Sequence, residues 1–281
     1  MTPSSKAARA LLAFYLDAGV DTLFGEEPID RFAETFPPPD AARPPSEMTR
    51  TEPKRSTIAS GPAAPTISAP PAAPATPEAA VMAAREAASI AKNLDDLRAL
   101  LEQFQGCTLR ATATRLVFAD GNAQGRVMFV GEAPGRDEDI AGVPFVGRSG
   151  KLLDLMLEAI GLDRTKAYIA NVVPWRPPGN RTPTPQETAI CLPFIRRQIE
   201  LANPEILVCL GQPATQTLLG TKEGITRTRG RWFKYDTGSR EIRALATYHP
   251  AFLLRSPLQK RLAWRDFLAL KKALAAAAAT T

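Results

Sequence analysis

Three groups of side chains that could do chemistry each follow a short apolar run in this sequence. Glu132 follows the run 127–130 and begins the acidic segment GEAPGRDED. Asn171 lies near the end of the run 168–173, and the only histidine, His249, follows the run 242–247. If these runs are parallel strands, ligands bind beyond their carboxyl ends. We therefore expect the carboxylate, the amide and the imidazole to meet at one candidate active site.

Each group alone also has an ordinary structural explanation. The glycines of GEAPG can form a tight turn, an asparagine at a strand end is often a turn former, and a histidine before proline is more often structural. The acidic segment lacks the Lys-Ser/Thr of a P-loop and the GxGxxG spacing of a dinucleotide site, so nucleotide binding is disfavoured. The convergence of the three groups is what favours a site.

The counts of histidine and cysteine exclude several classes of site. One histidine and three cysteines in 281 residues exclude sites with two or more histidines and any four-cysteine metal or iron–sulfur site built from one chain. The sparse, odd cysteine count also excludes a dense disulfide framework and indicates a reducing compartment. No apolar run approaches the ~18 to 20 residues that span a bilayer, and the N-terminus does not resemble a signal peptide. We therefore expect a cytoplasmic protein.

The net charge of +6 is distributed unevenly along the chain. Residues 1–100 hold 10 basic and 13 acidic residues, whereas residues 101–281 hold 25 and 16. A basic C-terminal part favours a polyanionic partner, and nucleic acid is the first choice. A solvated basic surface would give the same counts, so charge alone does not decide between the two.

The first 105 residues divide into three predicted segments. In residues 1–36, apolar residues at helical spacing predict a helix that could dock on the main domain or on a partner; its end, DTLF, weakly resembles a sliding-clamp peptide, although an ordinary apolar face explains it better. Residues 37–77 hold 12 of the 26 prolines and predict a disordered linker. Residues 78–105 form a helical lead-in, with start signals at Thr76 and Asn93.

From Arg126 onward, short apolar runs alternate with helical patterns. The runs 127–130, 168–173, 206–210 and 242–247 predict buried strands. Helices are expected at 151–160, 186–202, 213–219 and about 258–275. This alternation predicts right-handed crossovers and a parallel sheet that is covered on both faces. We therefore expect an α/β fold, a three-layer α/β/α sandwich with a central four-stranded parallel sheet, in residues 106–281.

Five segments of this domain resemble, in order, the motifs of family 4 uracil-DNA glycosylases. They are VGEAPGRDED, GVPFVGRSGKLLD, YIANVVPWRPPGNRTPTP, ILVCLG and YHPAFLLR, and the resemblance covers about residues 106–270. Nothing comparable covers residues 1–90. The resemblance implies an enzyme that flips uracil out of DNA and hydrolyses its N-glycosidic bond, leaving an abasic site for base excision repair.

The resemblance also implies roles for single residues of the pocket. Asn171 is expected to recognise uracil, because its amide carries both a donor and an acceptor. Phe145 matches the aromatic residue on which the flipped base stacks, and Ala133 belongs to the same uracil-binding set. His249 is expected to donate a hydrogen bond to a uracil carbonyl oxygen while negative charge develops there. Glu132 is expected to orient the attacking water or to stabilise the cationic sugar.

Further residues are expected to support the loop or to hold DNA. Glu138 and Asp139 match the acidic pair of the family, and a loop-supporting role and a solvated position are equally open. Leu253 and Leu254 are candidates for the wedge that fills the hole left by the flipped base. The DNA backbone contacts are expected from five arginines, some of which could instead pair with the acids of this domain: Arg148, Arg176, Arg181, Arg229 and Arg255.

The chain departs from the family at the cysteines. Family 4 enzymes typically hold a [4Fe–4S] cluster on four cysteines. Cys107 and Cys191 match two of these positions, whereas Arg110 and Trp175 stand at the other two. We therefore predict no cluster, no other metal and no cofactor. We also expect Arg110 to stack on Trp175 in a cation–π contact that replaces part of the lost bracing.

The leading hypothesis is a monofunctional uracil-DNA glycosylase. Relatives that capture DNA covalently use a histidine in residues matching 174–185, where this chain has none, so covalent capture is not expected. We expect a monomer that acts on single- or double-stranded DNA. Two alternatives remain: a catalytically silent DNA- or clamp-binding protein of the same fold, and a metal-dependent nucleotide or phosphate-ester hydrolase that uses the acidic loop.

Overall fold

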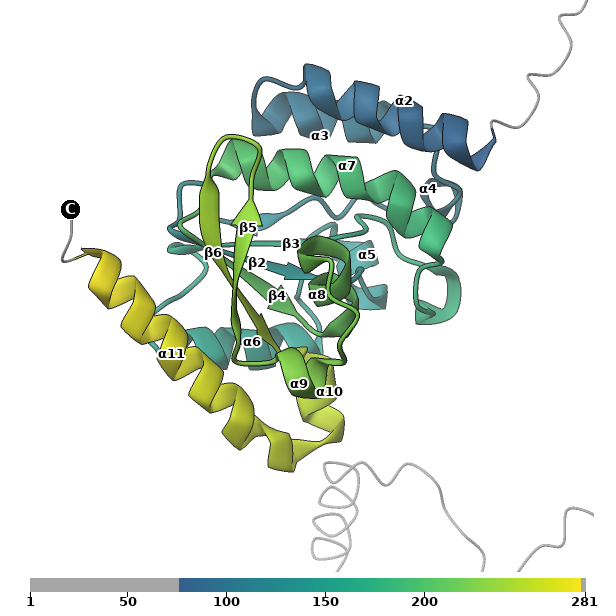
Figure 1. Ribbon diagram of the computed structural model, residues 1–281. Helices are drawn as coiled ribbons and strands as arrows, with labels where there is room; N and C mark the ends of the chain where they lie inside the picture. Colours follow the sequence, from purple (N-terminus) through teal and green to yellow (C-terminus); the bar gives the residue numbers. More distant parts are fainter. Residues whose placement is uncertain (1–75, 279–281) are drawn as a thin grey trace, which may run out of the picture. The chain divides into compact units, whose positions relative to one another are not determined.

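The protein is represented by a computed structural model that describes residues 76–278 (Figure 1). The predicted N-terminal helix with its clamp-like end, and the predicted linker except for its last two residues, lie outside the described residues. The first described helix, α2, begins at Pro77 after the capping hydroxyl of Thr76. The helical lead-in therefore starts one residue before the predicted boundary.

A mixed sheet of six strands, in the order β1-β3-β2-β4-β6-β5, forms the centre of the described domain. Its four inner strands are parallel and correspond to the four predicted runs, which confirms the predicted α/β fold. These inner strands are β2 (Val127–Gly131), β3 (Ala167–Asn171), β4 (Ile206–Leu210) and β6 (Glu241–Thr247).

Two antiparallel edge strands complete the sheet and were not predicted. β1 (Asp120–Gly121) pairs with β3, and β5 (Trp232–Asp236) pairs with β6. The four-stranded parallel sheet is therefore the core of a larger mixed sheet. Both additions lie at edges, away from the carboxyl ends of the inner strands where the chemistry-bearing residues were expected.

Helices cover both faces of the sheet. Side chains of successive strand residues point to opposite faces, so one strand contributes to two core clusters. Met128 and Val130 belong to one core cluster, with side chains from α2 (Pro77–Ile90), α3 (Leu94–Gln103) and α7 (Pro185–Ala202). Val127 and Phe129 belong to a second cluster, with α6 (Arg148–Glu158) and α11 (Lys260–Ala278). Figure 1 shows these two helical layers on opposite sides of the sheet.

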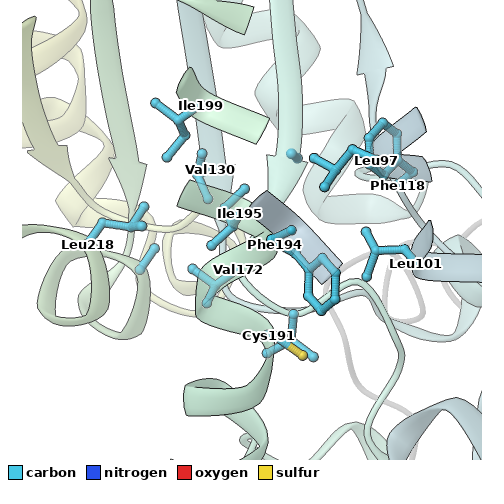
Figure 2. Close-up of a cluster of buried hydrophobic side chains, with 14 of the residues drawn as sticks. Leu97, Leu101, Phe118, Val130, Val172, Cys191, Phe194, Ile195, Ile199 and Leu218 are labelled. Atoms are coloured by element: carbon cyan, nitrogen blue, oxygen red, sulfur yellow. The ribbon is translucent and has the colours of Figure 1, made fainter. Parts of the chain in front are cut away.

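The lead-in helices α2 and α3 pack on α7. Leu97 and Leu101 of α3 share the first core cluster with Phe194 and Ile195 of α7 (Figure 2). Arg197 of α7 also donates two hydrogen bonds, of 3.1 and 2.7 Å, to the carbonyl oxygen of residue 91 at the end of α2. The helices before residue 106 are thus part of the same core as the sheet.

Several short helices follow the strand ends and carry the loops of the site. Of these, only the helix at 212–219 was predicted, since the others are too short to show a helical period. They are α4 (Leu109–Thr112), α5 (Arg136–Ala141), α8 (Gln212–Leu219), α9 (Ile225–Thr228) and α10 (Pro250–Arg255), with single 3-10 turns at Pro178–Asn180 and Pro257–Gln259. Among the described helices, none is both long and apolar enough to cross a membrane.

Candidate active site

A pocket of about 560 Å³ lies at the carboxyl ends of the inner strands. Glu132, Asn171 and His249 all line it. The first two lie side by side because Gly131 of β2 and Asn171 of β3 are paired in register. The end of β4 is held beside β6 by the Gly211 N–H, which donates to the carbonyl oxygen of Thr247 at 2.8 Å. The sheet thus brings the carboxylate, the amide and the imidazole to one place.

Glu132 has a carboxylate oxygen that is free to bind a ligand. Its backbone is fixed by the Val173 N–H, which donates to the Glu132 carbonyl oxygen at 3.0 Å. Its Oε1 is buried and has no hydrogen-bond partner among the described residues. Burial raises the pKa of Glu132, and a hydrogen bond with the Thr182 side chain partly opposes that rise in pKa. The group is therefore a carboxylate held ready to accept a proton or to bind water.

Asn171 carries a second oxygen without a partner. Its side chain is 4% exposed, and its Oδ1 has no hydrogen-bond partner among the described residues. A Cβ at Gly131 would lie 2.5 Å from this oxygen and 2.7 Å from Cζ of Phe145, so only glycine leaves the space in front of both. An unsatisfied buried polar atom costs about 1–3 kcal/mol. The cost indicates that a ligand with an N–H group is its intended partner.

Phe145 forms an aromatic wall of the pocket in a strained backbone conformation. Its φ is 55°, which for a bulky side chain is an outlier that costs of order 1–3 kcal/mol. Its ring lies 5.4 Å from the imidazole of His249, with 31° between the ring planes. Strain of this kind is concentrated at ligand clamps. The geometry therefore presents a flat apolar surface to a planar ligand.

His249 is held as a neutral hydrogen-bond donor. It is the N-cap of α10, and its Nδ1 accepts a hydrogen bond from the Ala251 N–H at 3.1 Å. Because Nδ1 is the acceptor, the single proton of a neutral ring lies on Nε2. Burial, and secondly the positive charge of Arg255, lower the pKa of His249 to about 4. At neutral pH the ring thus offers one N–H and no charge.

The acidic pair that follows Glu132 binds backbone groups. Glu138 accepts hydrogen bonds from the N–H groups of Gly135, Val146 and Gly147 at 2.9–3.0 Å. Asp139 accepts from the backbone and hydroxyl of Thr114 at 2.7 and 2.9 Å. Both carboxylates therefore support loops rather than lie solvated. Ala133 lines the pocket directly beside Glu132.

A second hollow, of about 420 Å³, adjoins the pocket and shares Gly135 and Ser149 with it. Arg148, Leu254 and Arg255 line it, as does Arg136, which the sequence had not singled out. Arg148 and Arg255 are exposed. Two of the arginines predicted to hold DNA, and one of the two predicted wedge residues, therefore lie around a single hollow beside the pocket.

The other three predicted DNA-contacting arginines have partners inside the protein. Arg181 lines the pocket but forms a bidentate pair with Glu187, at 2.7 and 2.8 Å. Arg176 donates to the side chain of Asn180 at 2.7 Å. Arg229 is ion-paired with Asp266 and its side chain is 16% exposed. Arg229 therefore anchors α11, and the expectation that it contacts DNA is corrected.

Leu253 is also placed differently from the prediction. It is 1% exposed and packs in a small core cluster with Tyr248 and Ala263. A side chain enclosed in this way cannot enter a DNA duplex unless α10 unfolds. Leu253 is therefore corrected to a core residue, and Leu254, which is partly exposed, is the one of the two leucines that reaches the hollow.

Sequence reasoning missed several residues that line the pocket. Thr182 contacts Glu132 although it carries no charge, and its only signal was its place in the segment NRTPTP. Ser149 lies at the start of α6, and Gln212 begins α8 directly after β4. Neither residue has a sequence signal beyond its place in a predicted loop. These three, with Asn180, Tyr248 and Phe252, add to the polar and aromatic lining.

The positions of the family's cluster ligands do not suit an iron–sulfur cluster. Cys107 and Cys191 are buried free thiols that share a hydrogen bond, which lowers the pKa of Cys107. Arg110 donates instead to the Gln105 side chain and the Glu102 carbonyl, both at 2.8 Å. Two thiols cannot supply the four iron ligands of a [4Fe–4S] centre. No other group of three or more histidine, cysteine or acidic residues suited to a metal occurs within residues 76–278.

The predicted stacking of Arg110 on Trp175 is wrong. The guanidinium–ring contacts of the described residues join other pairs, such as Arg243 over Trp232 at 3.9 Å. The physical reason is that the carbonyl and amide oxygens at the end of α3 satisfy the Arg110 guanidinium, while the Trp175 ring is enclosed in the apolar core. Packing of α3 on α7 supplies the bracing instead.

Taken as chemistry, the pocket suits hydrolysis of a bond to a planar heterocycle. An aromatic wall and an amide can bind such a ring on its face and its edge. A neutral imidazole N–H can stabilise negative charge on a leaving group, and a carboxylate with a free oxygen can orient water.

Comparison with known proteins points in the same direction. A family model described as the uracil DNA glycosylase superfamily matches residues 118–268. The type-4 uracil-DNA glycosylase of Archaeoglobus fulgidus is 40% identical over 180 residues, which are 63% of this chain and 90% of that protein. The type-4 enzyme of Thermotoga maritima is 45% identical over 151 residues, 53% of this chain and 77% of that protein. That of Saccharolobus solfataricus is 38% identical over 187 residues, 65% and 87% respectively.

Proposed function

The chain belongs to the uracil DNA glycosylase superfamily, and from this membership we propose how its pocket removes uracil from DNA. Its function is that of a uracil-DNA glycosylase, a hydrolase that cleaves N-glycosidic bonds in DNA repair. The observation that carries the mechanism is that two buried oxygens, of Glu132 and Asn171, have no hydrogen-bond partner within residues 76–278 and lie in one pocket beside a neutral imidazole.

Asn171 and Phe145 select and hold the base. The free Oδ1 of Asn171 accepts the N3–H of uracil, and its NH₂ group donates to the neighbouring carbonyl oxygen of the base. Cytosine presents an acceptor at N3 and an amino group beside it, so it would oppose like groups. The ring of Phe145 stacks on the face of the base, which is worth roughly 1–3 kcal/mol.

His249 stabilises the departing base. When the glycosidic bond breaks, the bonding electrons leave with uracil and negative charge develops on its carbonyl oxygen. The Nε2–H of His249 donates to that oxygen, and a neutral donor does so without a counter-charge in the ground state. Removal of one such donor elsewhere costs roughly 3–4 kcal/mol in the transition state.

Glu132 completes the hydrolysis. Its free Oε1 accepts a hydrogen bond from a water molecule and directs the water oxygen to the anomeric carbon. Its negative charge also stabilises the oxocarbenium-like sugar that forms as uracil leaves. The water proton passes to the carboxylate and is returned through solvent to the uracil anion, so that the products are uracil and an abasic site.

The hollow beside the pocket holds the DNA. The flipped nucleotide leaves a gap in the duplex, which costs a few kcal/mol in lost stacking. Leu254 fills that gap, while Arg148 and Arg255 bind phosphates of the same strand.

The enzyme works without an iron–sulfur cluster or another cofactor. Two observations support this part of the proposal. Cysteines stand at only two of the four cluster positions, and Arg110 and Trp175, at the other two, make contacts inside the protein. Iron analysis and a visible absorption spectrum of the purified protein test it, and iron near four atoms per chain would overturn it.

A labelled oligonucleotide with one uracil tests the function. Alkali after incubation should cleave the strand at the uracil, equally with and without a chelator. Glu132→Gln and His249→Ala should each lower the single-turnover rate by roughly 10²-fold or more. Glu241→Gln, at an exposed ion pair with Lys234, is the matched control and should keep the wild-type rate.

Two outcomes would favour the other readings. Cleavage that requires a divalent cation would indicate a metal-dependent hydrolase. Binding of uracil-containing DNA without release of uracil would indicate a silent binding protein. Near wild-type rates for both site variants, with unchanged melting temperatures, would overturn the residue assignment.

A further inference from the structure

Arg164 lies outside the pocket, in the turn before β3, and its guanidinium binds the loop that carries Phe145. It donates to the carbonyl oxygen of Pro144 at 3.1 Å and to that of Phe145. Asp120 and Asp154 also accept hydrogen bonds from this guanidinium, the latter at 2.8 Å. The side chain of Arg164 is mostly buried.

The loop of residues 144–147 is thereby bound from two sides by opposite charges. Arg164 binds its carbonyl groups, while Glu138 accepts from the N–H groups of Val146 and Gly147 at 3.0 and 2.9 Å. The helix behind the loop also presses close, since a Cβ at Gly150 would lie only 1.7 Å from the Phe145 carbonyl oxygen. Together, these contacts hold the loop in one conformation.

The contacts act on Phe145, an aromatic residue of the pocket wall. Phe145 has a φ of 55°, a conformation that its side chain disfavours. A strained conformation persists only where the surroundings over-determine it. Among the described residues, Arg164 is the side chain that donates to the Phe145 carbonyl oxygen. Loss of that bond removes the hold on the carbonyl side of Phe145, so we expect its backbone to relax and its ring to shift relative to His249.

We infer that Arg164 is a positioning residue for uracil. It fixes the backbone of Phe145 and so keeps the Phe145 ring in the position where it stacks on the base. The inference rests on the proposed function, in which Phe145 stacks on uracil. Arg164 itself touches neither the base nor the sugar. Its forked guanidinium is needed, since it must bind two successive carbonyls and two carboxylates at once.

Inhibition by free uracil tests the inference, because uracil occupies the pocket without any DNA contact. Arg164→Met keeps the apolar stem and removes the donors. We expect its inhibition constant for uracil to rise about tenfold, and its KM for uracil-containing DNA to change less, since phosphate contacts remain. The melting temperature reports the structural cost separately.

A double-mutant cycle separates positioning from general destabilisation. If Arg164 acts through Phe145, then Arg164→Met should weaken uracil inhibition no further in a Phe145→Ala background. Additive effects of the two substitutions would overturn the inference. Arg164→Lys keeps the charge that faces Asp120 and Asp154, so it serves where the methionine variant fails to fold. It should restore only part of the uracil affinity.

Arg126→Met is the matched control. Arg126 forms a bidentate pair with Glu205, at 2.7 and 2.8 Å, and donates to the carbonyl oxygen of Leu274, but it lies at the amino end of β2, away from the pocket. The Arg126→Met variant should have a lower melting temperature than the wild type, and its inhibition constant for uracil should be unchanged. Equal inhibition constants in the Arg126 and Arg164 variants would overturn the inference about Arg164 and leave the proposed function standing. A wild-type protein that releases no uracil would overturn the proposed function as well.

Discussion

At the scale of single residues, the pKa of the Glu132 carboxyl is set by burial and by the hydroxyl of Thr182. Burial raises the pKa of its carboxyl, and the Thr182 side chain is the group that opposes this rise. In the proposed mechanism, Glu132 directs water only when it is ionised. Burial lowers the pKa of His249 to about 4 and raises that of Glu132, so we expect protonation of Glu132 to set the acidic limit of the rate.

Thr182→Val tests this dependence. Valine has nearly the shape of threonine but cannot donate, so the pKa of Glu132 should rise further. Where the pH lies between the old and new pKa values, the variant is more protonated and slower; well above both, the rates are equal. The acidic limb of the single-turnover pH profile should therefore move to higher pH. Thr182→Ser keeps the donor and should keep the profile, and an unmoved limb in the valine variant would assign the pKa to burial alone.

At the scale of elements, the sequence predicted the strands that bury both faces. β2, β3 and β4 are buried along their whole length, and β6 is buried over its last four residues, which is typical of parallel strands covered on both sides. β5 was missed because it is a partly exposed edge strand in which Lys234 and Asp236 interrupt the apolar residues. β1 has two residues, too few for any pattern. What the sequence predicts well is therefore the part of the fold with the most burial.

The same limit applies to the site. Glu132, Asn171 and His249 could be found because a strand end places each of them. Arg164 could not, because its partners are as far away in sequence as Asp120 and no motif marks it. Leu253 and Leu254 are adjacent, and only the packing of α10 decides which of them is buried. The role of a residue that acts through packing, rather than through a sequence motif, can be recognised only in the structure.

One element is held by a buried ion pair that can be tested. Asp266 of α11 accepts hydrogen bonds from Thr247 of β6 at 2.8 Å and from Arg229 at 3.0 Å. Asp266→Ala leaves the mostly buried Arg229 without a carboxylate to balance its charge, so unfolding in urea should show a loss of about 3–5 kcal/mol. Glu241→Ala removes an exposed partner of Lys234 and should cost at most about 0.5 kcal/mol. Equal losses would contradict the assignment of Asp266 as the anchor of α11.

At the scale of the whole molecule, the basic charge of residues 101–281 should act through few positions. Arg148 and Arg255 lie around the hollow, whereas Arg176, Arg181 and Arg229 are engaged by internal partners. The three engaged arginines therefore add to the long-range attraction of DNA, whereas Arg148 and Arg255 are placed for direct contacts.

The salt dependence of DNA binding measures that part. In a Glu132→Gln background, Arg148→Ala and Arg255→Ala should each reduce the slope of log Kd against log salt by about 1, uniformly across sequences. Arg98→Ala removes an exposed arginine of α3, far in the fold from the strand ends, and should leave the slope unchanged. A slope that falls equally in all three would mean that the charge acts only as a diffuse field.

The packing of α2 and α3 against α7 has a consequence for the cell that makes this protein. In the proposed cluster-free enzyme, leucine and phenylalanine side chains of the chain itself hold the region around Cys107 and Cys191. Maturation then ends when the polypeptide has folded, with no cluster-assembly machinery and no demand on nutrient iron. Repair of deaminated DNA would persist through iron starvation and through oxidants that dismantle exposed clusters, conditions in which a metal-loaded counterpart would be lost.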